Sequence, residues 1–150
     1  MRMLSGMTMQ STDNNITQEN SKLLVAQNKC YELLYMPHRN RVYLHIFGFW
    51  KNRSQVPEYF PDLQKALALV QPGGFSLLLD LRTMITHPQA VMSKHIEVLG
   101  LLKEAGLRRA ACVDPADRIA SLQVNDTIDQ SHLVTRRFTS YSEAEAWLNE

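Results

Sequence analysis

The pattern of hydrophobic and polar positions predicts an α/β domain. Two strands are expected at 30–36 and 41–50, joined by turn residues at 37–40, and together they would form an antiparallel hairpin. Three further strands are expected at 75–81, 107–113 and 133–138, where short apolar runs are typical of buried strands. Helical spacing of apolar residues predicts four helices, at 56–70, 88–105, 116–124 and 140–148.

The order of these elements predicts how the sheet is built. The hairpin supplies one antiparallel pair, and the three later strands each follow a βαβ crossover, which makes them parallel. We therefore expect a mixed sheet of about five strands with about four helices, in a single domain over 29–150. Residues 1–28 are predicted to be a flexible tail, within which 21–27 fits either a short helix or an extra edge strand.

The second strand of the hairpin has two different faces. Val42, Leu44 and Ile46 form an apolar face that is expected to join the core. The opposite face is aromatic and partly polar, and the strand ends at Trp50; the residues of this face are Tyr43, His45, Phe47 and Phe49. We expect a partner, the tail or a ligand to cover this face, and it is also a candidate surface for a homodimer.

Several finer features belong to the helices. Pro61 is expected to bend the first helix or to delay its regular start. His95 lies on the apolar stripe of the second helix and is expected to be a hydrogen-bonded core histidine. In the third helix Ile119 and Leu122 are expected to point inward, and 125–130 is expected to be loose. The last helix carries a doubled capping-box signature, Ser140 with Glu143 and Ser142 with Glu145.

Composition and charge exclude several classes of function. The formal net charge of +1 gives no basic surplus for nucleic acid or an anionic membrane, and the pairs Arg108-Arg109 and Arg136-Arg137 are better explained as solvated charges beside strands than as a phosphate grip. Cys30 and Cys112 have no metal-binding spacing, which favours a reducing, cytoplasmic setting. No signal-peptide pattern and no apolar run of roughly 18 to 20 residues occurs, so no membrane span is expected.

Candidate chemistry gathers after the central strand. Asp80, Arg82, Thr83, Thr86 and His87 bring an acid, a base and hydroxyl groups near a helix N-terminus, which attracts anions. One interpretation is a small anionic ligand, or a regulatory phosphate on Thr83 or Thr86. The favoured alternative is helix capping with an Asp80–Arg82 surface pair.

Catalysis is the least favoured hypothesis. A hydrolase would use His87 with Asp80 or Asp114, but no serine or cysteine nucleophile accompanies His87 in a known motif. The histidines show no metal-binding spacing, and no glycine-rich phosphate loop is present. We therefore expect no enzyme, no metal and no cofactor.

Several landmarks over about residues 29 to 150 resemble the SpoIIAA-like group of STAS domains, which includes the anti-sigma factor antagonists. They are the strand 77–82, the leucine-rich helix ending at 101–106, the strand 108–114 and the C-terminal stretch 137–148. The resemblance implies a SpoIIAA-like fold and a regulatory role. In anti-sigma factor antagonists a serine at the start of the helix after the central strand is phosphorylated; that position falls near Pro88, Gln89 and Ala90, where this chain has no serine.

Two functions follow from these observations and from the resemblance. The first is a non-catalytic module that binds a protein partner through the loop 82–88, the helix that starts near Gln89 and the aromatic face of the second strand. The second is a carrier or sensor of a small apolar, acyl or anionic ligand, because the group also resembles CRAL-TRIO-type lipid carriers in architecture.

Overall fold

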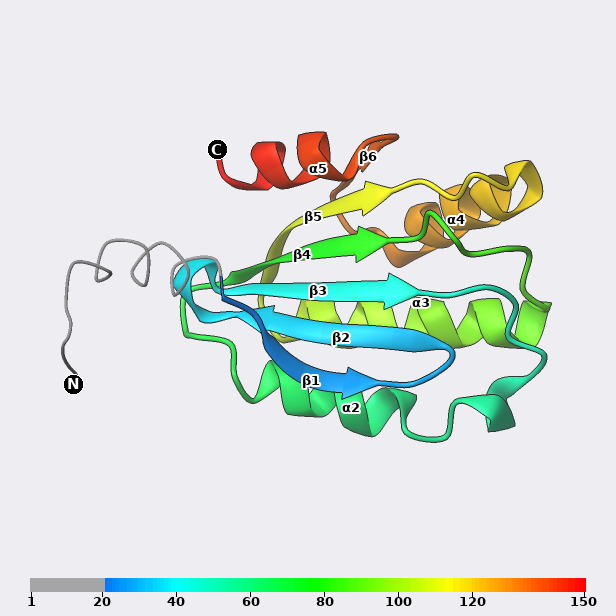
Figure 1. The fold of residues 1–150 in the computed structure, drawn as a ribbon, viewed down its shortest axis with the longest axis horizontal. Coiled ribbons are helices and arrows are strands. Elements are labelled where there is room, and N and C mark those ends of the chain that lie inside the picture. Colours follow the sequence, from blue (N-terminus) through cyan, green and yellow to red (C-terminus); the bar gives the residue numbers. More distant parts are fainter. Residues whose placement is uncertain (1–20) are drawn as a thin grey trace, which may run out of the picture.

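A computed structural model of the chain describes residues 21–150. One six-stranded sheet runs through it in the order β1-β2-β3-β4-β5-β6 (Figure 1). The strands are β1 (Leu23–Gln27), β2 (Tyr31–Met36), β3 (Arg41–Ile46), β4 (Phe75–Asp80), β5 (Leu107–Val113) and β6 (Thr135–Phe138). The helices are α2 (Tyr59–Leu67), α3 (Gln89–Glu104), α4 (Arg118–Ser131) and α5 (Tyr141–Leu148), with short 3₁₀ turns η1 (Pro37–Arg39) and η2 (Arg53–Gln55).

The mixed sheet confirms the predicted fold class with one strand more than expected. β1, β2 and β3 are antiparallel, whereas β3 to β6 are parallel to one another. The additional strand is β1, which settles the segment 21–27 as an edge strand. The sheet consequently begins before residue 29, where the domain was predicted to start; residues 1–20 of the predicted tail lie outside the described part of the chain.

The topology places three helices on one face of the sheet. Each crossover from β3 to β6 moves one strand further in the same direction, and right-handed crossovers of that kind put their helices on the same side. α2, α3 and α4 accordingly share a core with one face of the sheet, and α5 packs on the other face against β4, β5 and β6.

The alternation of side chains along the strands divides the core between these two faces. In β4, Leu77 and Leu79 point toward α2, α3 and α4, while Leu78 points toward α5. Tyr43 also lies on the α5 side, where it is buried and its hydroxyl donates to the Glu145 carboxylate of that helix. The C-terminal helix of the same chain therefore covers part of the face that was expected to require a partner, tail or ligand.

The prediction of one aromatic face holds for Tyr43, His45 and Phe47 but is wrong for Phe49. β3 ends at Ile46, and the chain then turns through Gly48, whose φ of +56° lies in the left-handed region. Phe49 and Trp50 consequently leave the plane of the sheet. Trp50 is fully buried on the α2 and α3 side, while Phe49 is exposed.

The third crossover helix differs most from its prediction. α4 continues to Ser131 through the stretch 125–130 that was expected to be loose. Its buried positions are Ala120, Val124 and Thr127, so Ile119 and Leu122, which were predicted to point inward, point outward and are both 62% exposed. The fully buried Ala120 lies on the inward face in their place.

Predictions about the starts of α2 and α5 are confirmed at Pro61 and at Ser140. α2 begins at Tyr59, so Pro61 sits in the first turn, where its missing N–H has no intrahelical partner to lose. The Ser140 side chain accepts from the Glu143 backbone N–H and caps α5. The second predicted capping box is wrong, because the Ser142 hydroxyl bonds to Ser140 and the Glu145 carboxylate accepts from the Tyr43 hydroxyl. Both cysteines are free and buried. Within residues 21–150, no helix is long and apolar enough to cross a membrane.

Candidate functional site

The segments that follow β3, β4 and β5 meet at one edge of the sheet, which we call the carboxyl edge. It lies at the right of Figure 1, where the parallel strands end. Gly48 N–H donates to Thr83 O over 3.0 Å and Ile85 N–H donates to Gly48 O over 3.1 Å, while Ala116 N–H donates to Arg82 O over 3.3 Å. These bonds gather side chains from three separate stretches of sequence, as expected where parallel strands end.

The loop 82–88 is firmly held at this edge. The Gln123 side chain of α4 accepts from His87 N–H over 3.0 Å and donates to His87 O over 2.8 Å. The side chain of Met84, a residue of the loop, is buried in the core. With both sides of the loop hydrogen-bonded, its exposed side chains are presented on a fixed backbone.

A cluster of five rings fills the interior behind this loop, and we call it the aromatic–histidine cluster. Its members are Tyr31, Trp50, Tyr59, His87 and His95. Trp50 stacks on His87 with ring centres 5.2 Å apart, and its indole N–H donates to the carbonyls of Cys30 and Phe47, each over 3.1 Å. The Tyr31 hydroxyl donates to the buried Asp62 carboxylate over 2.6 Å.

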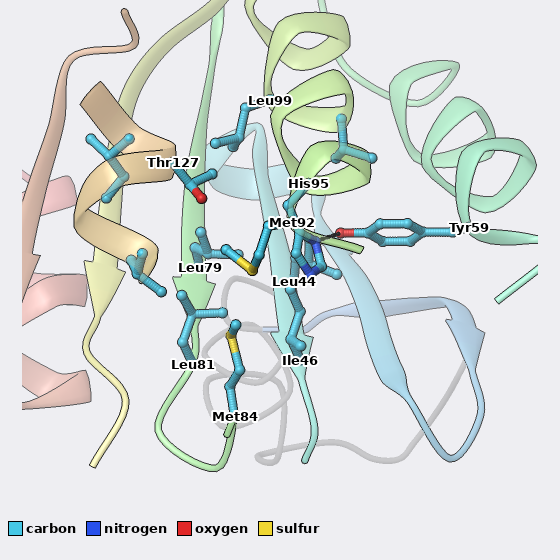
Figure 2. Close-up of a pocket in the computed structure, with 13 residues that line it drawn as sticks. Leu44, Ile46, Tyr59, Leu79, Leu81, Met84, Met92, His95, Leu99 and Thr127 are labelled. Carbon is cyan, nitrogen blue, oxygen red and sulfur yellow. Dashed lines mark hydrogen bonds between the residues drawn. The ribbon is translucent and has the colours of Figure 1, made fainter. Parts of the chain in front are cut away.

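One hydrogen-bond chain runs through the cluster, and its direction is determined by its end. The Gly48 carbonyl can only accept, so His87 Nε2, 2.8 Å away, carries the hydrogen. In a neutral ring His87 Nδ1 then accepts from His95 Nε2 over 3.1 Å. His95 Nδ1 in turn accepts from the Tyr59 hydroxyl over 3.1 Å (Figure 2). Every member is satisfied only when both histidines are neutral.

The electrostatics of the cluster agree with that arrangement. Burial lowers the pKa of His87, although the Gly48 carbonyl opposes part of this effect. Burial, together with the neighbouring His87, lowers the pKa of His95 to about 3. His95 is therefore the hydrogen-bonded core histidine that its place on the apolar stripe predicted. His87, expected in the loop after the central strand, is 1% exposed and belongs to the same interior network.

Asp80 and Arg82 form the predicted ion pair, but Asp80 is buried rather than at the surface. Arg82 Nε and Nη2 donate to its two carboxylate oxygens over 2.9 and 2.8 Å, and His45 Nε2 lies 3.8 Å away. Burial disfavours the charge on Asp80, yet the hydrogen bonds from Arg82 outweigh it and hold the pKa of Asp80 below its usual value. The exposed Arg82 guanidinium also lies over the Tyr141 ring, 5.1 Å from its centre.

The remaining predicted residues are spread around the same edge. Thr83 is exposed, with its hydroxyl 3.4 Å from His45 Nε2, and Thr86 is half-buried. Gln89 is exposed at the start of α3, and Phe47 packs edge-on against His45. Tyr43 and Trp50 lie in the two cores on opposite faces of the sheet. Trp50 meets His87 in the aromatic–histidine cluster, whereas Tyr43 lines a small hollow with His45 and Asp80 on the α5 side of the sheet.

The hydrolase arrangement is not assembled. His87 bonds to Gly48 and His95, Asp80 bonds to Arg82, and Asp114 accepts from Arg137 Nε over 2.7 Å. No hydrogen bond or ion pair among the described residues joins His87 to Asp80 or Asp114. A general base would need both a free ring nitrogen and access to a substrate, and His87 has neither in this conformation.

A small apolar cavity lies between the sheet and helices α2, α3 and α4. Its volume is about 30 Å³, and Met84, Met92, His95 and Leu99 are among the residues that line it (Figure 2). That volume is close to the share of a single water molecule in the liquid. Both ring nitrogens of His95 are already engaged, so the wall offers the cavity little polar character.

A group of apolar side chains points into solvent at the carboxyl edge, and of these the sequence analysis had named only Phe49 as a candidate binding residue. These residues are Phe49, Ile85, Ile119 and Leu122, and we call them the carboxyl-edge patch. Phe49 and Ile85 belong to the segments joined at Gly48, and α4 is tied to the loop through Gln123. Helical spacing could not reveal Ile119 and Leu122, because it assigns large apolar residues to the interior.

A search of protein-family models finds no match to this chain, and a search of curated proteins finds none either. Among solved structures, the chain is similar to an uncharacterized protein of the DUF3478 family from Shewanella loihica PV-4, whose crystal structure shows a SpoIIAA-like fold. The two share 14% sequence identity with a TM-score of 0.56, over 85% of this chain and 92% of that one. The likeness shows the SpoIIAA-like fold of this chain.

Proposed function

We propose that this chain is a non-catalytic STAS-like module that binds a protein partner at the carboxyl edge of its sheet. The observation that carries the proposal is the carboxyl-edge patch, whose four large apolar side chains are each between 44% and 62% exposed. Single exposed apolar residues are ordinary, but a group of them beside charged side chains is typical of an interaction surface.

The rigidity of the loop 82–88 supports the same function. Its hydrogen bonds to Gly48 and Gln123 fix Ile85 relative to α4, so little conformational freedom remains to be lost on binding. Arg82, exposed in the same loop as Ile85 and oriented by Asp80, supplies a charge at this edge. An apolar centre with a polar rim is the usual arrangement of a protein–protein interface.

The acid and base candidates at this edge support a binding role over a catalytic one. The Asp80 carboxylate is neutralised by Arg82, and both ring nitrogens of His87 are occupied. These groups maintain the shape of the edge, which is what a docking surface requires.

Partner capture with charge-introducing variants tests the proposal. The double variant Ile119→Glu/Leu122→Glu places two carboxylates in the patch at exposed positions, so the fold should persist while the partner is lost. Leu69→Glu/Val134→Glu is the matched control, since both residues are exposed apolar side chains that precede β4 and β6 at the opposite edge. Cross-linked pull-downs from the native cell extract should recover the same partner with the wild type and the control.

The patch variant should recover that partner at background level, and with purified partner its Kd should rise by about tenfold or more. Equal recovery by both double variants, or no partner above background with the wild type, would refute the proposed function. Circular dichroism of each variant separates loss of binding from loss of fold.

The apolar cavity favours a second candidate, a carrier or sensor of a small apolar ligand. At about 30 Å³ the cavity is too small for an acyl chain, so a ligand of that kind requires Met84 and Met92 to move. Native mass spectrometry of protein purified without detergent would show an added mass of a few hundred daltons if such a ligand is carried. A bare chain would remove this candidate and leave the partner-binding function.

A further inference from the structure

Four arginines gather at the edge of the sheet opposite the carboxyl edge, where the parallel strands begin. They are Arg39, Arg41, Arg108 and Arg109, and they line an open hollow of about 390 Å³. The hollow lies between the start of β3, β4 and β5 and the end of α5, at the left of Figure 1. Among the described residues that line it, Glu150 carries the only carboxylate side chain.

Arg41 gives this hollow a buried donor. The side chain is 2% exposed; its Nε donates to Ser76 Oγ over 3.0 Å, its Nη1 to the Tyr43 hydroxyl over 3.4 Å, and Glu145 lies 3.8 Å away. A guanidinium has five N–H donors, and the bonds to described residues use two of them. The ion pair with Glu145 compensates part of this buried charge, and Arg41 lines the hollow with donors that no described residue uses.

Separate contacts hold Arg108 and Arg109 in place. The stem of Arg108 lies directly over Gly74, where a Cβ atom would stand only 2.0 Å from Arg108 Cδ, and Arg108 Nη1 donates to Gly73 O over 3.4 Å. The Arg109 guanidinium lies over the Trp147 ring, 4.0 Å from its centre. These contacts orient guanidinium groups before any ligand arrives, which lowers the entropic cost of binding.

We propose that this hollow binds a small anion that carries two or more phosphate groups. Guanidinium groups match phosphate oxygens through paired N–H donors, and several of them converge here on a chain whose formal net charge is only +1. The size of the hollow lies in the range of small-molecule sites. The adjacent pair Arg108-Arg109, taken from sequence as solvated charge, thereby acquires a ligand-binding role.

Nucleic acid fits the same observations less well. Polynucleotides are bound by basic faces that extend along many phosphates, usually on domains with a strong positive charge. The basic group here is confined to one hollow, and the chain as a whole is close to neutral. The proposal is independent of the proposed function, because the two sites lie at opposite edges of the sheet.

Isothermal titration calorimetry with sodium pyrophosphate at physiological salt tests this site. Pyrophosphate should bind with one-site saturation and about tenfold more tightly than orthophosphate, because two phosphate groups reach more of the arginines. Arg39→Gln/Arg108→Gln removes two exposed arginines of the hollow and should weaken binding by about tenfold or more. Glu150→Gln removes the opposing carboxylate and should strengthen binding two- to threefold, on the order of a single screened charge.

Arg53→Gln/Arg118→Gln is the matched control. It removes the same net charge from exposed arginines at the carboxyl edge and should leave the affinity for pyrophosphate unchanged. Equal weakening by both double variants would show general charge attraction and overturn the site. Absence of saturable binding by the wild type at millimolar pyrophosphate would overturn it as well.

Discussion

The neighbours of His87 and His95 fix the direction of the hydrogen bond between them, which requires both rings to be neutral. The stability of the fold should therefore depend on pH. Both rings are buried, and burial lowers the pKa of each, that of His95 to about 3. In the unfolded chain a histidine has a pKa near 6.5. Between these values the unfolded state binds more protons, so stability is complete above pH about 6.5 and falls as the pH is lowered.

We therefore expect acidification from pH 7.5 to 5 to reduce the free energy of unfolding by about 2 kcal/mol through His95 alone. His87 adds to this loss with the same sign. Urea denaturation across this pH range measures the change. The histidine contribution dominates there because carboxylates such as Asp80, whose pKa is held low, lose their charge only at lower pH.

The variant His95→Gln tests whether this pH dependence of stability originates at His95. A glutamine can donate to His87 and accept from Tyr59, but it has no proton to gain, so the pH dependence should become shallower by the contribution of His95. His38→Gln removes an exposed histidine and should leave the dependence as in the wild type. A wild-type protein with the same stability at both pH values would contradict the assigned hydrogen-bond direction.

At the scale of elements, α4 determines how the carboxyl edge is presented. Its N-terminus is capped by Asp117, whose carboxylate accepts from Ala120 N–H over 2.8 Å, and two turns on its Gln123 holds the loop at His87. Asp117→Ala removes the cap and the favourable charge near the helix N-terminus. We expect it to lower the free energy of unfolding by about 1 kcal/mol, measured by urea denaturation.

Asp129→Ala is the control for that prediction. Asp129 is exposed in the last turn of the same helix, where a negative charge opposes the helix dipole, so its removal should be neutral or slightly stabilising. If the two variants lose equal stability, the capping role of Asp117 is wrong.

For the molecule as a whole, the sequence predicted elements whose signals are local. The central strand β4 and the helix α3 after it were foreseen because a buried parallel strand is continuously apolar and Gly106 ends the helix. β1 could not be assigned, since it is a short edge strand in which Leu23 and Leu24 remain exposed. Its place depends on pairing with β2, which is a tertiary contact.

The orientation of α4 and the site at the carboxyl edge depend on residues far apart in the sequence. Ile119 and Leu122 are more apolar than Thr127, yet the helix buries the opposite face, which carries Ala120, Val124 and Thr127. The burial of His87 could not be predicted because its partners, Gly48 and Gln123, lie 39 and 36 positions away in the sequence. The periodicity of apolar residues contains no information about the contacts of His87 with Gly48 and Gln123.

The two proposed sites lie at opposite ends of the parallel strands, and this separation yields a prediction for the whole molecule. β4 spans six residues, which at about 3.3 Å per residue separates the two edges by roughly 20 Å. That distance exceeds the Debye length of about 8 Å at physiological salt, and the two groups of residues share no direct contact in the described chain. Substitutions at such distances normally act independently.

Ile119→Glu/Leu122→Glu should therefore leave the affinity for pyrophosphate within about twofold of the wild type, as measured by calorimetry. Arg39→Gln/Arg108→Gln should recover the protein partner as fully as the wild type does. Thermodynamic linkage is reciprocal, so a partner that alters pyrophosphate affinity must itself bind more or less tightly when pyrophosphate is present. Such a reciprocal change would contradict independence and would place the coupling in the strands β3, β4 and β5, which connect the two edges.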